Sequence, residues 1–268
     1  MDFLNQSYDI IVLAGQSNAE GTGRGCVEVE YEPNDDVISL SPIYKISRKI
    51  ENEVSKRAII YADEPFCFEI ASERIVNESK YGDLSLIFAK NYKQQGCLNE
   101  GRKLLIIRAA IGSTGFKHGQ WGISGPLYLK MCEMLEYALS LNESNKLVAL
   151  LWHQGEHEVG KENPPEVYES QLKEMLLDFK ERFSSPSLPI ISADFSRKWK
   201  TAKREKAAAI SSVIEKVITS LGGVFLDTSD LLSNSEKNGD GDAIHFCRES
   251  LYILGERYFN AYNANYRK

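Results

Sequence analysis

The sequence is poor in cysteine, and none of its cysteines stands in a CxxC pair. There are five, scattered along the chain: Cys26, Cys67, Cys97, Cys132 and Cys247. Closely spaced cysteine pairs are typical of disulfide frameworks and of structural zinc sites, so this scatter argues against both. An odd number of isolated thiols is typical of a protein in a reducing compartment. We therefore expect reduced cysteines and a cytoplasmic location.

Long apolar runs and an excess of positive charge are also missing. No stretch reaches the roughly 18 apolar residues that a membrane-spanning helix needs. The opening residues, MDFLNQSYDI, lack the basic start and the apolar core of a secretory signal. With a formal net charge of −6, the chain has no electrostatic attraction for nucleic acid or for an anionic membrane. We expect neither as a partner, and the sequence leaves the oligomeric state open.

What the chain does contain is an alternation of short apolar runs and helical patterns. The runs predict five strands, at 8–14, 103–110, 146–152, 188–195 and 222–228. Apolar residues three and four apart predict helices over 127–141, 168–183 and 202–220, and another after Arg248. This alternation is typical of an α/β fold with a parallel sheet covered on both faces. We predict one three-layer α/β/α domain over residues 1–268, with a mainly parallel five-stranded sheet and a long loop excursion over 18–80.

Small and polar residues follow four of these strands, at the edge where open α/β sheets bind ligands. The segments read GQSN (15–18), IGSTGF (111–116), HQGEHE (153–158) and GDGDAIHF (239–246). Together they supply a serine, histidines, carboxylates and glycines with backbone N–H groups. Acyl transfer requires these groups: a nucleophile, a base, an acid that orients the base, and donors for the oxyanion.

The blocks GQSN, WHQGE and DAIHF, in this order, resemble the SGNH hydrolase superfamily. They are most similar to its sialic-acid-specific acetylesterase branch, which includes the acetylxylan esterases of carbohydrate esterase family six. The stretches GDLSLIFAKNY (82–92), AAIGSTGF (109–116) and LGERYF (254–259) extend the similarity over nearly the whole chain. The resemblance implies a flavodoxin-like strand order and a serine esterase that removes O-acetyl groups from a small-molecule or oligosaccharide substrate, of the acetylxylan or the O-acetylated sialic acid type. It implies no cofactor and no metal.

Carried over residue by residue, the resemblance makes Ser17 the nucleophile and His245 its general base. The backbone N–H groups of Ser17 and Gly112 would hold the oxyanion, together with the side-chain amide of Gln154. Ser113 departs from the glycine that is usual at its position, which restricts the local backbone.

Two carboxylates could orient the imidazole of His245. Asp242 lies three residues before the histidine, so local spacing brings its carboxylate to the ring. Glu156 comes from another strand end, and its longer side chain could reach the same ring. Both positions match motifs of the family. We predict that Asp242 is the orienting acid and that Glu156 supports the site.

Five further residues in or near these blocks are predicted to contact the substrate: Gln16, Asn18, Thr114, Trp121 and His157. The two amides flank the nucleophile. The indole of Trp121 could stack on the face of a sugar, although it could equally pack in the core or under a lid.

Two other functions stay open. HQGEH (153–157) matches the HxxEH pattern of a zinc hydrolase, which requires both histidines on one face of a helix. The strand-like run before His153, and Gly155 between the histidines, oppose a helix at that point. The other alternative is a non-catalytic carbohydrate-binding protein, against which the serine, histidine and acid positions argue.

Overall fold

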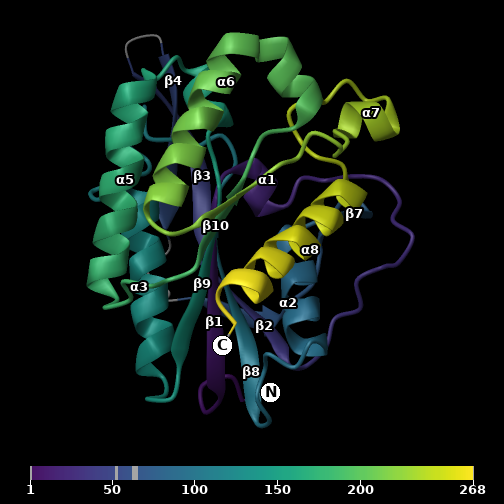
Figure 1. The fold of residues 1–268 in the computed structure, drawn as a ribbon, viewed down its shortest axis with the longest axis vertical. Helices are drawn as coiled ribbons and strands as arrows, with labels where there is room; N and C mark the ends of the chain where they lie inside the picture. The colour runs from purple at the N-terminus through teal and green to yellow at the C-terminus, as the bar shows by residue number, and fades with distance from the viewer. Residues whose placement is uncertain (1, 52–53, 62–65, 268) are drawn as a thin grey trace.

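In the computed structural model, which describes residues 2–51, 54–61 and 66–267, a main sheet lies between two layers of helices (Figure 1). Its seven strands are β1 (Ser7–Gly15), β2 (Val37–Ser41), β5 (Cys67–Ile70), β8 (Arg102–Ala110), β9 (Lys146–His153), β10 (Ile190–Ala193) and β11 (Val224–Leu226). The helices are α1 (Ser17–Glu20), α2 (Leu84–Gln94), α3 (Pro126–Ser140), α4 (Glu156–Gly160), α5 (Pro165–Arg182), α6 (Arg197–Ser220), α7 (Asn234–Asn238) and α8 (Arg248–Asn265). Two hairpins complete the described chain, β3 (Tyr44–Glu51) with β4 (Val54–Tyr61), and β6 (Arg74–Val76) with β7 (Ser79–Tyr81).

The strands of the main sheet follow the order β11-β10-β9-β1-β8-β2-β5. The five strands expected from the sequence are neighbours in this order. Numbered among themselves, they follow the 2-1-3-4-5 order of flavodoxin-like sheets. Neighbouring strands are parallel except β2 and β5, which are antiparallel. The α/β class is confirmed, but the predicted number of strands is wrong: β2 and β5 come from the excursion and extend the sheet beyond β8.

Each face of the sheet carries its own apolar core, because successive side chains of a strand point to opposite faces. On β1, Ile10 and Val12 pack into one core and Ile11 and Leu13 into the other. Helices α3, α5 and α6 cover the first core, and α2 and α8 cover the second (Figure 1). The predicted helices are confirmed as α3, α5, α6 and α8. Within the described ranges, no helix has both the length and the apolar character to cross a lipid bilayer.

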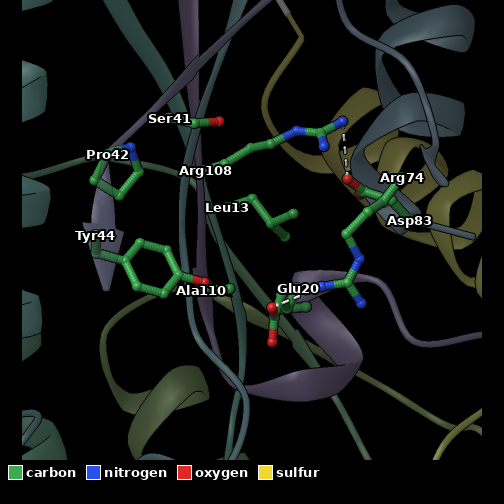
Figure 2. Close-up of a pocket in the computed structure, with 10 residues that line it drawn as sticks. Leu13, Glu20, Ser41, Pro42, Tyr44, Arg74, Asp83, Arg108 and Ala110 are labelled. Carbon is green, nitrogen blue, oxygen red and sulfur yellow. Dashed lines mark hydrogen bonds and ion pairs between the residues drawn. The ribbon is translucent and has the colours of Figure 1, made fainter. Parts of the chain in front are cut away.

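The excursion is fastened to the rest of the fold at several points. Arg248, at the start of α8, is buried and forms ion pairs with Glu73 and Glu30 of the excursion. A backbone bridge joins Gly23 to Gly82, just before α2. Where the excursion meets the carboxyl ends of β1 and β8, it encloses a pocket of about 140 Å³ (Figure 2).

Candidate active site

A sharp turn between β1 and α1 presents Ser17 at the carboxyl edge of the sheet. Gly15 has a φ of +138°, and a Cβ at this position would lie 2.0 Å from the carbonyl oxygen of His153. Only glycine allows this close approach of two strand ends. The next N–H, that of Gln16, donates to the same carbonyl at 3.0 Å, and α1 then begins with Ser17. The tight strand–turn–helix connection therefore fixes where the serine hydroxyl lies.

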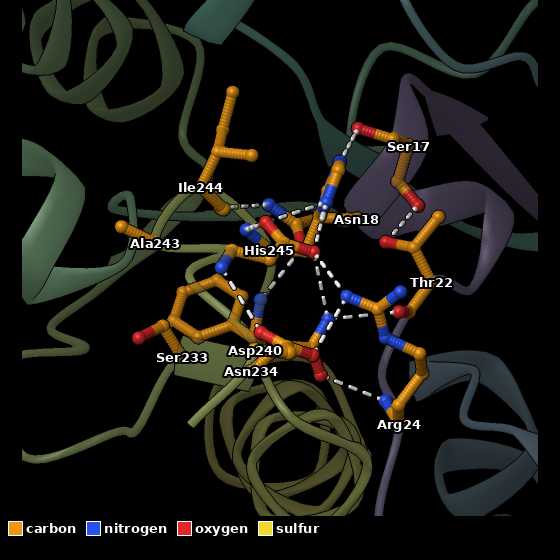
Figure 3. A network of polar contacts seen from close by, with 12 residues as sticks. Ser17, Asn18, Thr22, Arg24, Ser233, Asn234, Asp240, Ala243, Ile244 and His245 are labelled. Atoms are coloured by element: carbon orange, nitrogen blue, oxygen red, sulfur yellow. Dashed lines mark hydrogen bonds and ion pairs between the residues drawn. The ribbon is translucent and has the colours of Figure 1, made fainter. Parts of the chain in front are cut away.

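Ser17, His245 and Asp242 form a chain of hydrogen bonds, of which Figure 3 shows the contact between Ser17 and His245. His245 Nε2 lies 2.9 Å from Ser17 Oγ, and its Nδ1 lies 2.9 Å from Asp242 Oδ2. An ionised carboxylate only accepts hydrogen bonds, so Nδ1 carries the ring proton and Nε2 offers its lone pair to the serine. Of the two predicted acids, it is Asp242 that touches the imidazole in this structure. The arrangement has the geometry that a serine nucleophile and its base require.

Two residues that sequence reasoning did not identify hold the Asp242 carboxylate. Arg24 donates to Oδ2 at 2.8 Å, and Asn234 donates to the same oxygen at 3.1 Å. Arg24 also pairs with Asp240 at 2.9 Å. Burial by itself raises the pKa of Asp242, but hydrogen bonds from His245 and Asn234 outweigh it and lower the pKa to about 2. The acid therefore stays ionised at neutral pH, as the orientation of His245 requires.

Glu156 has a different place in the site. Its side chain is buried, accepts a hydrogen bond from Asn18 Nδ2 at 2.7 Å, and lies 3.7 Å from His153 Nε2. Burial opposes the charged form, but contact with His153 and the hydrogen bond from Asn18 hold the pKa of Glu156 below its ordinary value. Asn18 in turn accepts from the N–H of Phe246, the residue that follows His245. Through Asn18, Glu156 thus supports the loop that carries His245.

The three predicted oxyanion donors differ in their surroundings. The N–H of Gly112 donates to Glu20 Oε2 at 2.6 Å. The amide nitrogen of Gln154 donates to Glu158 at 2.9 Å, and the side chain is 1% exposed. As the first residue of α1, Ser17 has an N–H without an intrahelical acceptor. Gln154 stays a candidate donor, but its amide would have to leave Glu158 to reach an oxyanion at Ser17.

Trp121 and Thr114, which are predicted to contact the substrate, are buried core residues in this structure. Trp121 is 2% exposed and meets the ring of Trp152 edge-on, at 5.0 Å between centroids. Its indole N–H donates to Thr114 Oγ1 at 3.1 Å, and the threonine hydroxyl donates to the carbonyl of Ile111. These contacts fix the loop after β8. Ser113, in the same loop, has a φ of +60°, a conformation that a glycine adopts with less strain.

Gln16 and Asn18, which are also predicted to contact the substrate, are held by neighbouring loops in this structure. Both are buried, and their side chains join the loops at the strand ends. Gln16 Oε1 accepts from the N–H of His157 at 3.0 Å, after β9. Asn18 bridges Glu156 and Phe246, as described above. The two amides beside the nucleophile therefore hold the site together.

His157 is the one predicted substrate contact that is partly exposed. Its Nε2 lies 3.0 Å from His118 Nδ1. Burial, followed by the neighbouring His118 and Lys161, lowers the pKa of His157 to about 4, so the ring is neutral at pH 7. It stays a candidate for contact with the substrate.

The two histidines of the HxxEH pattern do not converge. His153 ends β9 and lies near Tyr258, at 3.4 Å, whereas His157 lies in α4 against His118. In the part of the chain that the structure describes, no group of three or more His, Cys, Asp or Glu side chains is arranged to hold a metal ion. The donor geometry therefore does not fit the zinc alternative.

Comparisons with known proteins identify a family and similar solved structures. The family model for carbohydrate esterases of the sialic acid-specific acetylesterase type matches residues 7–264. Among solved structures, NanS superimposes with a TM-score of 0.69 at 18% identity, over 98% of both chains. A protein from Arabidopsis thaliana gives 0.66 at 20% identity, over 98% of this chain and 99% of its own. A carbohydrate acetylesterase from Xanthomonas citri gives 0.63 at 13% identity, over 96% of this chain and 56% of its own.

At these identities, the structural likeness shows a shared fold. No curated protein matches the chain. The family model, in contrast, covers the chain except for a few residues at each end. The chain therefore belongs to the sialic acid-specific acetylesterase family of carbohydrate esterases, which are carboxylic ester hydrolases.

Proposed function

We propose that this enzyme removes O-acetyl groups from a carbohydrate through a covalent acetyl-enzyme on Ser17. The observation that carries the proposal is the hydrogen-bonded chain from Ser17 through His245 to Asp242, with contacts of 2.9 Å at both ends of the imidazole. A serine alone is a weak nucleophile, and an adjacent base that a third group orients is what activates it. Family membership supports an acetylated sugar as the substrate.

The reaction follows from the protonation states in the chain. His245 Nε2 takes the hydroxyl proton as Ser17 Oγ bonds to the ester carbonyl carbon. The ionised Asp242 stabilises the imidazolium that results. When the C–O bond to the sugar breaks, the imidazolium gives its proton to the leaving alcohol. Water then attacks the acetyl-serine by the same route, which releases acetate and restores the serine.

Stabilisation of the oxyanion is proposed to come from the N–H groups of Ser17 and Gly112. Such donors must lie about 3 Å from the position of the developing negative charge. The Gly112 N–H is held by the Glu20 carboxylate in this structure, so the carboxylate has to withdraw before that donor serves the reaction. The other carboxylate oxygen, Glu20 Oε1, is paired with Arg74 at 2.8 Å, and this ion pair can persist when Oε2 leaves Gly112.

The substrate class can be tested by measuring acetate release from three kinds of ester. We would offer acetylated xylo-oligosaccharides, O-acetylated sialic acids and a small aryl acetate, with Ser17→Ala as the matched control. The proposal predicts release from at least one sugar and none above background from Ser17→Ala. Release from the aryl acetate without any sugar would indicate a general esterase instead, and no release at all would favour a non-catalytic sugar-binding protein.

We also propose a cytoplasmic location. The five cysteines are unpaired in the structure, which fits a reducing compartment. Cell fractionation with an antibody to the native protein would test this, and recovery from a secreted fraction would contradict it.

A further inference from the structure

The acid that orients His245 lies at the end of a loop of alternating glycines and aspartates, GDGD over 239–242. Gly239 and Gly241 have φ angles of +71° and +81°, and a Cβ on either glycine would meet no atom within 4 Å. Packing around these glycines therefore does not hold the loop. The position of the Asp242 carboxylate depends instead on the groups that contact the carboxylate itself.

Arg24 joins the two acids of this loop. Its Nη2 lies 2.8 Å from Asp242 Oδ2 and 2.9 Å from Asp240 Oδ2 (Figure 3). Because both oxygens contact the same nitrogen atom, the two carboxylates lie close together. Their side chains are only 19% and 30% exposed, so water screens the repulsion between the two negative charges incompletely. The positive charge of Arg24 offsets this repulsion.

The backbone of Arg24 is anchored independently of its side chain. Its N–H donates to Asn234 Oδ1 at 2.8 Å. Its carbonyl oxygen accepts from the N–H of Arg248 at 2.9 Å and from Asn238 Nδ2 at 3.2 Å. A substitution that alters only the guanidinium therefore leaves these three hydrogen bonds in place, and the charge can be removed without releasing the segment.

We propose that Arg24 is a positioning residue for ester hydrolysis, because its charge lets two carboxylates share one short loop and so keeps Asp242 against the imidazole of His245. Asp242 Oδ2 is the oxygen that both Arg24 Nη2 and His245 Nδ1 contact. Without the cation, repulsion from Asp240 would turn the Asp242 carboxylate toward solvent and away from Nδ1. This role rests on the function proposed above, since it acts through His245.

A double-substitution cycle tests the proposal directly. Arg24→Gln keeps a hydrogen-bond donor but removes the charge. We expect it to lower kcat on a small aryl acetate by about tenfold to a hundredfold, the effect of an uncompensated like charge in a partly buried site. KM should change by less than about threefold, because Arg24 acts through the base and not on the bound ester. Adding Asp240→Asn removes the repelling charge and should bring kcat back to within about fivefold of wild type.

Three further variants complete the test. Asp240→Asn alone should stay within about threefold of wild type, because Asp240 has no contact with His245 or Ser17 in the described structure. Arg24→Lys keeps the charge and should retain at least about threefold more activity than Arg24→Gln. Arg182→Gln is the matched control. Arg182 pairs with Glu136 between α5 and α3 and is 39% exposed, against 38% for Arg24. We expect this control to leave kcat unchanged, and melting temperatures would be recorded for every variant.

Four results would overturn the inference. The first is a folded Arg24→Gln protein with kcat within threefold of wild type, and the second is a double variant no more active than Arg24→Gln. The third is an equal loss in Arg24→Lys and Arg24→Gln, which would show that the charge is not what matters. The fourth is a raised KM at unchanged kcat, which would make Arg24 a substrate contact.

The proton on Nδ1 of His245 provides a readout that needs no catalysis. A ring proton held by a carboxylate exchanges slowly and resonates at low field in the ¹H NMR spectrum, and its loss in Asp242→Asn would identify it. We expect the resonance to disappear in Arg24→Gln and to return when Asp240→Asn is added. If the wild type cleaves no ester but the resonance behaves in this way, the proposed function fails and the role of Arg24 in holding Asp242 stands. If the wild type cleaves esters but Arg24→Gln keeps both the resonance and kcat, the role of Arg24 is wrong and the function stands.

Discussion

Replacing Asp242 by asparagine should remove most of the activity and leave the fold intact. The carboxylate accepts from four groups: Nδ1 and the backbone N–H of His245, Arg24 and Asn234. An amide of the same shape has one oxygen to accept and one NH₂ group that only donates. Because Arg24 and Asn234 can only donate at this position, they will hold the oxygen. The NH₂ group then takes the position of Oδ1, which lies 3.0 Å from Nδ1 of His245.

That exchange reverses the tautomer of the imidazole. The N–H group that now points at Nδ1 from the Oδ1 position favours the tautomer with the ring proton on Nε2, which faces Ser17 at 2.9 Å. A protonated Nε2 cannot take the serine proton. In the well-studied serine proteases, the same change lowers kcat by about 10⁴. We expect a loss of roughly 10³–10⁴ here, equivalent to about 4–5.5 kcal/mol in the activation free energy.

The assay is hydrolysis of a small aryl acetate by purified wild type and Asp242→Asn, with melting temperatures recorded for both. Asp240→Asn is the matched control, because Asp240 pairs with the same Arg24 but has no contact with the ring of His245 in the described structure. We expect the control to keep activity within about threefold, in the range of a surface substitution. Activity of Asp242→Asn within tenfold of wild type, or equal losses in the two variants, would refute the reasoning.

Three further predictions follow from the site. Glu156→Gln should lower kcat by about tenfold to a hundredfold, less than Asp242→Asn, because it acts on His245 only through Asn18; a larger loss in a folded variant would make Glu156 the principal acid. Glu20→Gln should raise kcat about fivefold on the aryl acetate, because it removes a negative charge beside the developing oxyanion. A tenfold fall in kcat would show instead that Glu20 positions the loop that carries Gly112. Trp121→Ala should cost about 3–5 kcal/mol of unfolding free energy, measured by denaturant titration, and leave the preference among acetyl esters unchanged. A higher KM for sugar esters at unchanged stability would instead show that Trp121 contacts the substrate.

The sequence was sufficient to predict the central strands and the long helices. β1, β8 and β9 are near-continuous apolar runs because helices bury both of their faces. β2 (VISLS) and β5 (CFEI) are four or five residues long and lie in a stretch with Pro33, Pro42 and Pro65. Pairing at the edge of the sheet holds them in place: β2 pairs with β8, and β5 pairs with β2. Such tertiary pairing leaves little signal in a local pattern.

The candidate site, too, could be predicted from the sequence only in part. Motif spacing was enough to bring Ser17, Asp242 and His245 together as candidates, since each follows a strand at the same edge of the sheet. It could not show which way their neighbours point. One residue of helix turns the chain by about 100°, so Asn18 faces inward to Glu156 while Ser17 faces His245. Arg24 is 218 residues away from Asp242 along the chain, and no local pattern links the two.

The most direct test of the account is acetate release by Ser17→Ala compared with wild type, on whichever acetylated sugar the wild type cleaves. Both proteins would be checked for equal melting temperatures. Loss of the nucleophile should lower kcat by roughly 10⁴ or more. What remains would be the uncatalysed reaction and the small acceleration that substrate binding alone provides. A folded Ser17→Ala protein with activity within tenfold of wild type would contradict the acetyl-enzyme mechanism.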